Sequence, residues 1–445
     1  RFDLEHGRPR VPSFYGLEAL QAICGELPAF DELTRRAHPG AAPRLGWPAP
    51  SDPEQAIDDA EYDVAILERF RSASEPSVGA ARYLLQSNPY LARALRFRAR
   101  RWQLQRFHAA DGFVVSTPSA ERLLPLHALS QRSYSASALA QFASCPYKFY
   151  LSALARLSEP ERIAEVDELD ARQRGVLFHA VQRDVLQELQ AAGLVPLTEA
   201  GHERARELLA LCLERALAQA REVYAPAIER VFDAALASLR ADLSGWLSRL
   251  FADRDWQPLH AELEFGFERL RSAQDEGGLR EQVRVAQGLL LSGAIDLVEQ
   301  QATPAPDGRR VLRATDHKTG VAQGKLFVSQ GGAVLQPLLY ALALEQLFPT
   351  AAVRGGRLHF CTKRGRYEVQ EVVLDDQARQ VAQRIVAAIG GMLERGFLPA
   401  APQRGACESC KFRVICGPYE EDRVAQVKAR DGARLLPLVE LRSLP

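Results

Sequence analysis

The sequence lacks any uninterrupted apolar run of 18 residues, and it lacks an excess of charge of either sign. The first absence predicts that no segment crosses a membrane. The charge balance, 56 Lys and Arg against 56 Asp and Glu, gives no argument for a nucleic-acid partner, because such partners are usually indicated by a basic excess. The first residues also lack the apolar core of a secretory signal, so we expect a cytoplasmic protein.

Methionine occurs only once, and the chain does not begin with it, which is typical of a fragment or of a processed protein. Cysteine occurs seven times, an odd number that favours metal binding or buried thiols over structural disulfides. The 445 residues are otherwise ordinary, with 25% charged and 47% hydrophobic residues. This composition excludes a disordered, collagen-like or disulfide-scaffold chain, and the length is sufficient for two or three domains.

The first 130 residues predict a mostly helical region that is broken by proline-rich loops. Apolar spacing over residues 56–70 predicts an acidic amphipathic helix, and residues 91–107 predict a basic helix with interleaved aromatic side chains. The arginines of the basic helix have two interpretations, a solvated face or a contact with phosphates. Residues 112–116 predict a short strand.

From residue 133 the pattern changes to long helices followed by strands. A helix is expected to start at a Ser135 or Ser137 cap and to end at Leu154. Further helices are predicted over residues 174–190, 198–224, 226–252, 334–348 and 376–395. Strands are predicted over residues 260–267, 282–298, 310–318, 357–362 and 367–373. This order favours an α/β or α+β core.

Charged residues interrupt two of the apolar strands. Asp296 lies within one of them, and Asp316 and Lys318 end the next. Such groups are costly in a buried strand unless they are paired or bind a metal. Alternate residues of a strand share a face, so Asp316 and Lys318 lie together, and Asp296 joins them if the two strands pair. Two carboxylates suit Mg²⁺ or Mn²⁺, whereas a buried Asp–Lys ion pair is the structural alternative.

Other polar residues near these strands are ambiguous when each is taken alone. His179 lies on a preceding helix, and Gln336 and Tyr340 lie one turn apart on a later one. Each of these has an ordinary structural explanation. Glu262 and Glu264 share a strand face and are either additional carboxylate ligands or solvated side chains.

A second cluster consists of cysteines. Cys407, Cys410 and Cys416 form a C-x2-C-x5-C pattern, and Cys145 is the best candidate for a fourth ligand. Zinc and iron–sulfur clusters both accept four cysteines, and three close ligands with one distant ligand are less typical of zinc. The pattern therefore favours iron–sulfur and leaves open zinc or a site without metal. The remaining thiols lie in apolar contexts and are expected to be small buried hydrophobic residues: Cys24, Cys212 and Cys361.

Together these patterns resemble the PD-(D/E)XK nucleases of the RecB type that carry an iron–sulfur cluster, and among them the C-terminal part of the AddB subunits of AddAB helicase–nucleases. The matching elements occur in the family's order between residues 133 and 419. They are Ser135-x-Ser137 with Cys145-Pro146-Tyr147, Gly175 to His179, Gly293-x-Ile295-Asp296, Asp316 to Gly320, Gln336 to Tyr340, and Cys407, Cys410 and Cys416. The resemblance implies an α/β nuclease core, a central mixed sheet flanked by helices, over residues 131–425. It also implies a helicase-like helical remnant over residues 1–130 and a tail over residues 426–445.

The resemblance also implies roles for the individual residues. His179, Asp296 and Asp316 would bind Mg²⁺ or Mn²⁺, and Lys318 would be the catalytic lysine. Gln336 and Tyr340 would contact DNA, and a [4Fe–4S] cluster would be held by Cys145, Cys407, Cys410 and Cys416. Two features depart from related patterns. His317 stands where an aromatic residue is usual and is expected to point away from the catalytic side chains, and no P-loop is present, so we expect no ATP hydrolysis.

These roles predict a metal-dependent deoxyribonuclease, an exonuclease that processes double-strand-break ends for recombinational repair. The expected partners are DNA and an AddA-like helicase–nuclease subunit. One alternative is a stand-alone iron–sulfur exonuclease acting on single-stranded DNA, against which the N-terminal extension argues. The other is a DNA-end-binding module without activity, against which the intact set of charged residues argues.

Overall fold

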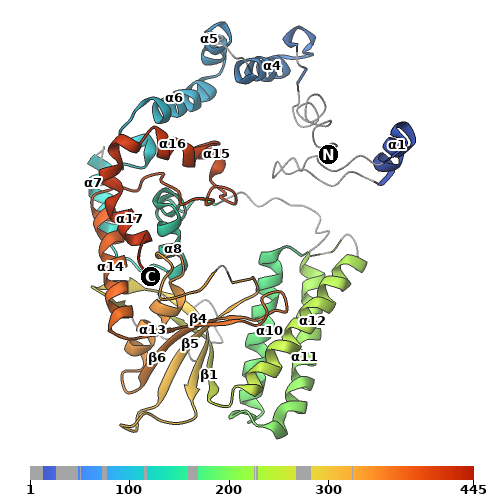
Figure 1. Cartoon of the computed structure of the whole chain (residues 1–445), viewed down its shortest axis with the longest axis vertical. Helices are drawn as coiled ribbons and strands as arrows, with labels where there is room; N and C mark the ends of the chain where they lie inside the picture. The colour runs from blue at the N-terminus through green and yellow to red at the C-terminus, as the bar shows by residue number, and fades with distance from the viewer. Residues whose placement is uncertain are drawn as a thin grey trace. The chain divides into compact units, whose positions relative to one another are not determined.

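The computed structural model describes residues 14–26, 49–50, 52–72, 78–114, 118–158, 169–224, 226, 229–266, 282–322 and 324–445. The chain divides into two compact units, Arg1–Arg100 and Arg101–Pro445. Figure 1 shows their elements coloured along the chain. Among the described helices, none combines the length and the apolar character that a membrane-spanning helix needs.

The first unit is helical in its described part. Its helices are α1 (Phe14–Cys24), η1 (Pro53–Gln55), α4 (Asp59–Ser72), α5 (Val78–Ser87) and the start of α6 (Pro89–Gln103). The predicted acidic helix corresponds to α4 and the predicted basic helix to α6. The Tyr83 hydroxyl of α5 donates a hydrogen bond to the Asp63 carboxylate of α4, at 2.8 Å. Cys24 was wrongly expected to be buried: it is exposed, because most described side chains of α1 face solvent rather than a core.

A five-stranded mixed sheet forms the centre of the second unit. Its order is β1-β4-β5-β6-β7, where the strands are β1 (Trp256–Phe265), β4 (Gly293–Gln301), β5 (Val311–Lys318), β6 (Ala352–Phe360) and β7 (Val369–Val373). Only the β5–β6 pair is parallel; the other neighbours are antiparallel. A parallel pair needs a crossover, and α13 (Gln336–Leu347) lies in the connection between β5 and β6.

The prediction of one strand over residues 282–298 was wrong. The chain forms a separate hairpin there, β2 (Val283–Val285) and β3 (Leu289–Leu291), before β4 begins. Three successive residues between β2 and β3 have positive φ, Ala286, Gln287 and Gly288, which reverses the chain. The short strand expected over residues 112–116 is reduced to a single bridge between Phe113 and Phe397. Residues 115, 116 and 267 of the predicted strands lie outside the described residues.

The helix expected to end at Leu154 is interrupted at Cys145. It is divided into α8 (Ala136–Ser144), α9 (Pro146–Phe149) and the π-helical turn η4 (Tyr150–Leu154). Pro146 has no amide hydrogen and disfavours a helical conformation in the residue before it, so Cys145 is extended, with φ −164° and ψ 115°. The predicted start is confirmed, because the Ser135 hydroxyl accepts a hydrogen bond from the Ala138 amide.

Three long helices form a layer with its own core: α10 (Ala171–Ala191), α11 (His202–Tyr224) and α12 (Glu229–Ala252). In Figure 1 these green helices lie on one side of the sheet. Phe178, Phe232 and Trp246 are fully buried among their leucines, together with Leu297 of β4. The long helical segments predicted before the sheet are therefore confirmed, and they cover one of its faces.

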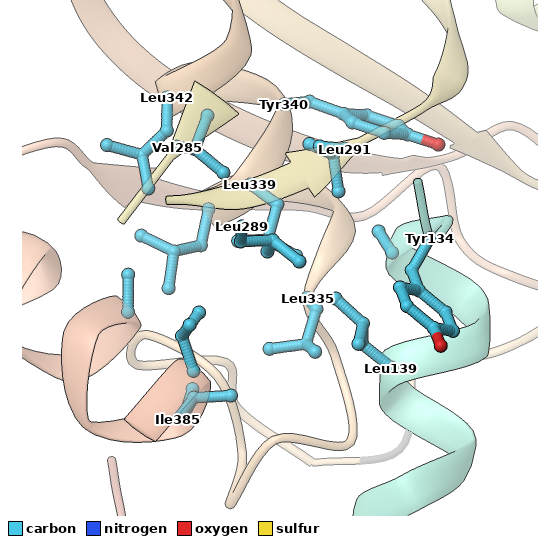
Figure 2. Packing of buried hydrophobic residues seen from close by; sticks show 14 of the residues in the cluster. Tyr134, Leu139, Val285, Leu289, Leu291, Leu335, Leu339, Tyr340, Leu342 and Ile385 are labelled. Atoms are coloured by element: carbon cyan, nitrogen blue, oxygen red, sulfur yellow. The ribbon is translucent and has the colours of Figure 1, made fainter. Parts of the chain in front are cut away.

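A second core lies on the other face of the sheet. Figure 2 shows it where Leu339 of α13, Ile385 of α14 (Asp376–Glu394), Leu139 of α8 and Leu289 of the hairpin meet. The remaining short elements are η2 (Ala109–Asp111), α7 (Pro118–Leu123), η3 (Leu124–His127), η5 (Glu199–Gly201), α15 (Arg413–Cys416), α16 (Glu420–Gln426), η6 (Ala429–Leu435) and α17 (Leu436–Arg442). The expected architecture, a mixed sheet flanked by helices, is confirmed.

The C-terminal segment packs onto this second unit. Leu438 and Leu441 of α17 are buried in the same core as the residues of Figure 2. The Arg442 guanidinium donates hydrogen bonds to the carbonyl oxygens of Ala143, Ser144 and Ala401, at 2.7 to 3.1 Å. These bonds fix the end of α8 against the loop that precedes the last three cysteines.

Candidate active site and cysteine pocket

The two aspartates lie where neighbouring strands separate. The β4–β5 pairing reaches Leu297 opposite Thr315, which brings Asp296 and Asp316 to the same end of the pair. Beyond that point the Asp296 carboxylate accepts a hydrogen bond from the His317 backbone amide, at 2.6 Å. The side chain of Asp296 therefore occupies the place where a further backbone contact between the strands would lie. The adjacency on which the predicted carboxylate pair depended is confirmed.

Lys318 completes the predicted strand motif. Its Nζ lies 2.5 Å from Oδ2 of Asp316, as expected for alternate residues on one face of a strand. The ammonium group is about one-third exposed and the Asp316 carboxylate is 8% exposed, so the pair stands at the edge of a buried region. A substrate group can therefore reach the lysine while the carboxylate stays shielded from bulk water.

His179 reaches the same place from α10. Asp170 caps the start of this helix, and its carboxylate accepts a hydrogen bond from the Gln173 amide at 2.7 Å. The residue before His179, Phe178, is anchored in the helical core. Nδ1 of His179 lies 3.5 Å from Oδ2 of Asp296. The structure thus brings together residues that are more than one hundred positions apart in the sequence.

Glu262 joins the site from β1. The ligand atoms of His179, Glu262 and Asp296 all lie within 4.8 Å of one another. In the β1–β4 register, Glu262 falls between the pairs that flank Asp296, and its φ of 49° is left-handed. In the described part of the chain that group contains Glu262 and not the buried Glu264, so the structure separates two glutamates that the sequence left equivalent. Alternation along a strand could not distinguish them.

The electrostatics of the site are those of crowded carboxylates. Burial, and then the charges of Asp316 and Glu262, raise the pKa of Asp296 well above its usual range. Burial works to lower the pKa of Lys318, but the Asp316 and Asp296 carboxylates outweigh it and raise that pKa. Burial lowers the pKa of His179, which favours its neutral form. The site therefore offers three carboxylates and a neutral imidazole as possible ligands, with one ammonium group beside them. These ligands fit Mg²⁺ or Mn²⁺.

The two α13 residues lie at the N-terminal end of that helix. Gln336 is its first residue and is half-buried. Tyr340 is buried, and its hydroxyl is so close to Gly293 that a Cβ there would lie 3.2 Å from it. Burial and the charges of Asp316, Asp296 and Glu262 raise the pKa of Tyr340. Tyr340 therefore faces the carboxylates as a neutral phenol.

The four predicted cysteine ligands line one pocket. It contains Cys145 from the α8–α9 junction and Cys407, Cys410 and Cys416 from the C-terminal loop and α15. Its wall is apolar and aromatic, with Tyr147, Leu151, Ala400 and Phe412. The break at Cys145 has a consequence here, because the Lys148 backbone amide that starts α9 points toward the Cys145 sulfur. The structure therefore brings together the four thiols that the sequence pattern selected.

The apolar environment of the pocket disfavours ionisation of its thiols. Burial raises the pKa of Cys145 and of Cys407 to about 12, so without a cation both stay protonated. Among the described residues the four thiols do not form a group packed within 4.8 Å. A single zinc ion holds its sulfurs about 3.8 Å apart, whereas an iron–sulfur cluster binds each on a separate iron and spreads them further.

One charged residue beside the pocket was missed by sequence reasoning. Arg101 belongs to the basic helix that was assigned to solvent or to phosphate contact, yet it is 1% exposed. Its guanidinium forms a short ion pair with Glu420 and a hydrogen bond with the Cys416 sulfur. Glu420 and Cys416 lie more than 300 residues away from Arg101, so no local pattern could have revealed these two contacts. Arg423 and Lys428 extend this buried network by ion pairs to Asp111, each at 2.8 Å.

Comparison with known proteins agrees with this fold. Residues 133–417 match the PD-(D/E)XK nuclease superfamily, a range that contains the sheet and both groups of residues described above. The chain belongs to the PD-(D/E)XK nuclease superfamily. It is also 25% identical, over 349 aligned residues, to an ATP-dependent helicase/deoxyribonuclease subunit of Symbiobacterium thermophilum. That alignment covers 63% of this chain and 29% of the relative, so the chain spans less than a third of the relative's length.

Proposed function

We propose that this chain is a metal-dependent deoxyribonuclease that hydrolyses phosphodiester bonds at DNA ends. The observation that carries the proposal is the meeting of His179, Asp296, Asp316 and Lys318 at one end of the β4–β5 pair. A structural Asp–Lys ion pair accounts for two of these residues only. It does not explain why the His179 imidazole and the Glu262 carboxylate lie beside Asp296, or why the pKa of Asp296 is raised there.

The division of labour follows from the chemistry of the side chains. His179, Asp296 and Asp316 would hold Mg²⁺ or Mn²⁺, with Glu262 as an additional carboxylate within reach. When bound, the ion would supply Lewis-acid chemistry that polarises the scissile phosphate and lowers the pKa of a water molecule. Lys318, held by Asp316 and partly exposed, orients that water and stabilises the charge that develops on the phosphate.

The DNA is proposed to approach from the side of α13. Tyr340 places a neutral hydroxyl beside the carboxylates, and Gln336 lies one helical turn before it. Neutral hydrogen-bond donors suit a phosphate backbone that is already close to negative side chains. Gln336 and Tyr340 would therefore position the strand next to the reacting phosphate.

The four cysteines are proposed to hold a [4Fe–4S] cluster. The support is their meeting in one apolar pocket, their separation and the guanidinium of Arg101 beside Cys416. Such a cluster joins the start of the nuclease domain to its end. By closing a long loop it stabilises the folded chain without taking part in the hydrolysis.

The biological setting is proposed from the named relative. That protein is a helicase/deoxyribonuclease subunit, so we infer that this nuclease acts in double-strand-break end processing, on a strand delivered by an AddA-like helicase–nuclease partner. The chain spans 29% of the relative, which leaves the greater part of such a protein without a counterpart here.

The test is a nuclease assay on end-labelled single-stranded and duplex DNA with Mg²⁺ or Mn²⁺. We expect cleavage by the purified chain, alone or with an AddA-like partner, and loss of cleavage in the Asp316→Asn variant. DNA binding without cleavage under all these conditions would contradict the proposal and would favour a DNA-end-binding module. Cleavage that is equal in the wild type and in Asp316→Asn would assign the activity to another site.

A further inference from the structure

Three side chains with metal-binding chemistry lie together on the reverse face of the catalytic strand. His317 of β5 stands directly opposite His359 in the parallel β5–β6 register, and Cys361 follows His359 by two residues. Alternate residues share a face, so these three point away from the side occupied by Asp316 and Lys318. Their ligand atoms all lie within 4.8 Å of one another.

These side chains are buried beneath the helical layer. His317, His359 and Cys361 are 2%, 5% and 0% exposed. The Trp246 ring of α12 lies edge-on to the His317 ring, with 6.0 Å between the centroids. Cys361 packs in the core of α10, α11 and α12. The Cys361 thiol donates a hydrogen bond to the His359 carbonyl oxygen, at 3.2 Å, so the two residues are also in contact with each other.

Polar atoms of this group lack partners. Within the described part of the chain, neither Nε2 of His317 nor Nδ1 of His359 has a hydrogen-bond partner. The amide oxygen of Gln182 has none there either, and the amide group of this residue lies beside the Cys361 thiol. Buried polar atoms of this kind are rare because desolvation is not repaid, and a concentration of them in one place indicates a ligand.

We propose that His317, His359 and Cys361 form a buried metal site that binds Zn²⁺. Two imidazole nitrogens and one thiolate sulfur are the ligands of a borderline-soft ion, and they differ from the oxygen-rich set around Asp296. The amide oxygen of Gln182, beside Cys361, is suited to the fourth position. Tetrahedral zinc with bonds of about 2.0 to 2.3 Å places its ligand atoms about 3.5 Å apart, so adjustments of about one ångström close the site.

The surrounding charges permit a cation. Arg357 is the charged residue that acts most strongly on His359, and the Glu299 carboxylate pairs with it at 2.9 Å. Arg249 lies over the Tyr367 ring, at 3.5 Å from its centroid. Burial and Arg357 lower the pKa of His359 to about 3, so its imidazole is neutral, as metal ligation requires. The thiolate of Cys361 would neutralise half of the zinc charge.

Zinc at this place would be structural. It would tie β5 to β6 through their adjacent histidines and would hold the backbone of His317, whose amide donates to Asp296 on the opposite side of the strand. The two groups of residues are neighbours, with 6.4 Å between the centroids of the His179 and His317 rings. The inference is nevertheless independent of the proposed nuclease function, because none of its ligands belongs to the proposed catalytic set.

The test measures zinc content of the purified full chain by elemental mass spectrometry, after dialysis against Zn²⁺ alone and then against metal-free buffer. We expect about one tightly held zinc per chain, and X-ray absorption at the zinc edge should show two imidazole ligands and one sulfur. Cys361→Ser and His359→Gln should each lose it. Cys212→Ser is the matched control, since Cys212 is also fully buried in the helical layer, and it should retain the zinc.

A second comparison separates this site from the cysteine pocket. Cys410→Ala should retain the zinc, whereas zinc that disappears with Cys410 and shows a four-sulfur absorption signature would belong to that pocket and would overturn the proposal. Wild-type protein that takes up no zinc, or Cys361→Ser protein that keeps it, would also overturn it. The absorption spectrum of the wild type decides the ligand set even if a histidine variant fails to fold.

Discussion

The backbone amide of His317 donates a hydrogen bond to the Asp296 carboxylate at 2.6 Å, while the His317 ring is buried on the reverse side of the strand. One residue of β5 thus contacts the candidate catalytic carboxylate through its main chain and a buried histidine–cysteine group through its side chain. The alternation of a β-strand makes this possible, because Asp316 and Lys318 on either side of His317 face the opposite way. Changes on either face of β5 should therefore be felt on the other.

The first prediction concerns the catalytic pair. Asp316→Asn removes a charge that holds Lys318 and a proposed metal ligand, and Lys318→Met removes the ammonium itself. Each should lower the cleavage rate by about a hundredfold or more, measured in single-turnover assays with Mg²⁺, while the melting temperature stays near that of the wild type. Asp307→Asn, in a loop where Asp307 pairs only with Arg309 in the described structure, should cleave normally. Equal activity in all three variants would remove these residues from the mechanism.

The second prediction concerns pH and metal binding. Burial and the charge of Asp316 raise the pKa of Asp296 in the folded protein. In the metal-free protein, protonated Asp296 therefore contributes stability that is fully present below its unfolded-state pKa. This contribution is lost as the pH rises through the folded-state pKa. Mg²⁺ binds the ionised carboxylate and relieves this loss. The rise in melting temperature on adding Mg²⁺ should therefore grow from about pH 5 to about pH 8. Asp296→Asn should abolish the response, and Asp233→Asn, at an exposed position, should keep it. A response that is independent of pH would contradict the assignment.

The third prediction concerns the cysteine pocket. Cys410→Ala removes one of four proposed cluster ligands, so the brown colour and broad visible absorption of an iron–sulfur protein should be lost. The melting temperature should fall as well, because the link between Cys145 and the C-terminal loop is broken. Cys24→Ala, at an exposed position, is the control that should change neither. A colourless wild-type protein prepared without oxygen would count against the cluster.

The fourth prediction concerns the buried ion pairs between Glu299 of β4, Arg313 of β5 and Arg357 of β6. Glu299 is fully buried, and its carboxylate contacts Arg313 and Arg357, each at 2.9 Å, and the Thr315 hydroxyl. Glu299→Gln leaves the two guanidinium groups undercompensated and should lower the free energy of unfolding by about 3 to 5 kcal/mol in urea denaturation at neutral pH. Glu203→Gln, in an exposed pair, should change it by less than about 1 kcal/mol.

The pH dependence of that variant follows from the same contacts. Burial opposes ionisation of Glu299, but Arg357 and Arg313 outweigh it, so its pKa is lowered. A lowered pKa contributes stability above the unfolded-state value of about 4.3, and this is lost as pH falls through the folded-state value. The difference between wild type and Glu299→Gln should therefore narrow in acid. A constant difference would show that packing rather than charge is responsible.

The fifth prediction concerns the approach of α13 to the sheet. A Cβ at Gly356 of β6 would lie 2.1 Å from the Pro337 carbonyl oxygen, so only glycine permits this contact. Gly356→Ala should displace the start of α13, which carries Gln336 and Tyr340. It should both lower the melting temperature and weaken DNA binding, measured by fluorescence anisotropy. Gly308→Ala, at a turn with nothing near its Cβ, should leave DNA binding unchanged. If Gly356→Ala binds DNA as the wild type does, the position of α13 does not control the contact with DNA.

The relation between sequence and structure differs from one part of the site to another. Asp316 and Lys318 were predictable as a pair because the period of a strand is local, and the Cys407, Cys410 and Cys416 pattern is contiguous. Their joining to Asp296, His179 and Cys145 needed either a family resemblance or the fold. The break at Cys145 was present in the sequence as Pro146, although periodicity alone predicted a continuous helix.

The sequence by itself determined most of the helices and strands and the candidate site residues, because these follow from local periodicity and side-chain type. Only the tertiary structure decided which of two glutamates reaches Asp296, that Arg101 is buried beside Cys416, and that His317, His359 and Cys361 share one face. The physical reason is that these relations depend on strand register, on a single left-handed residue and on the packing of segments that lie far apart in the chain, none of which leaves a periodic signal.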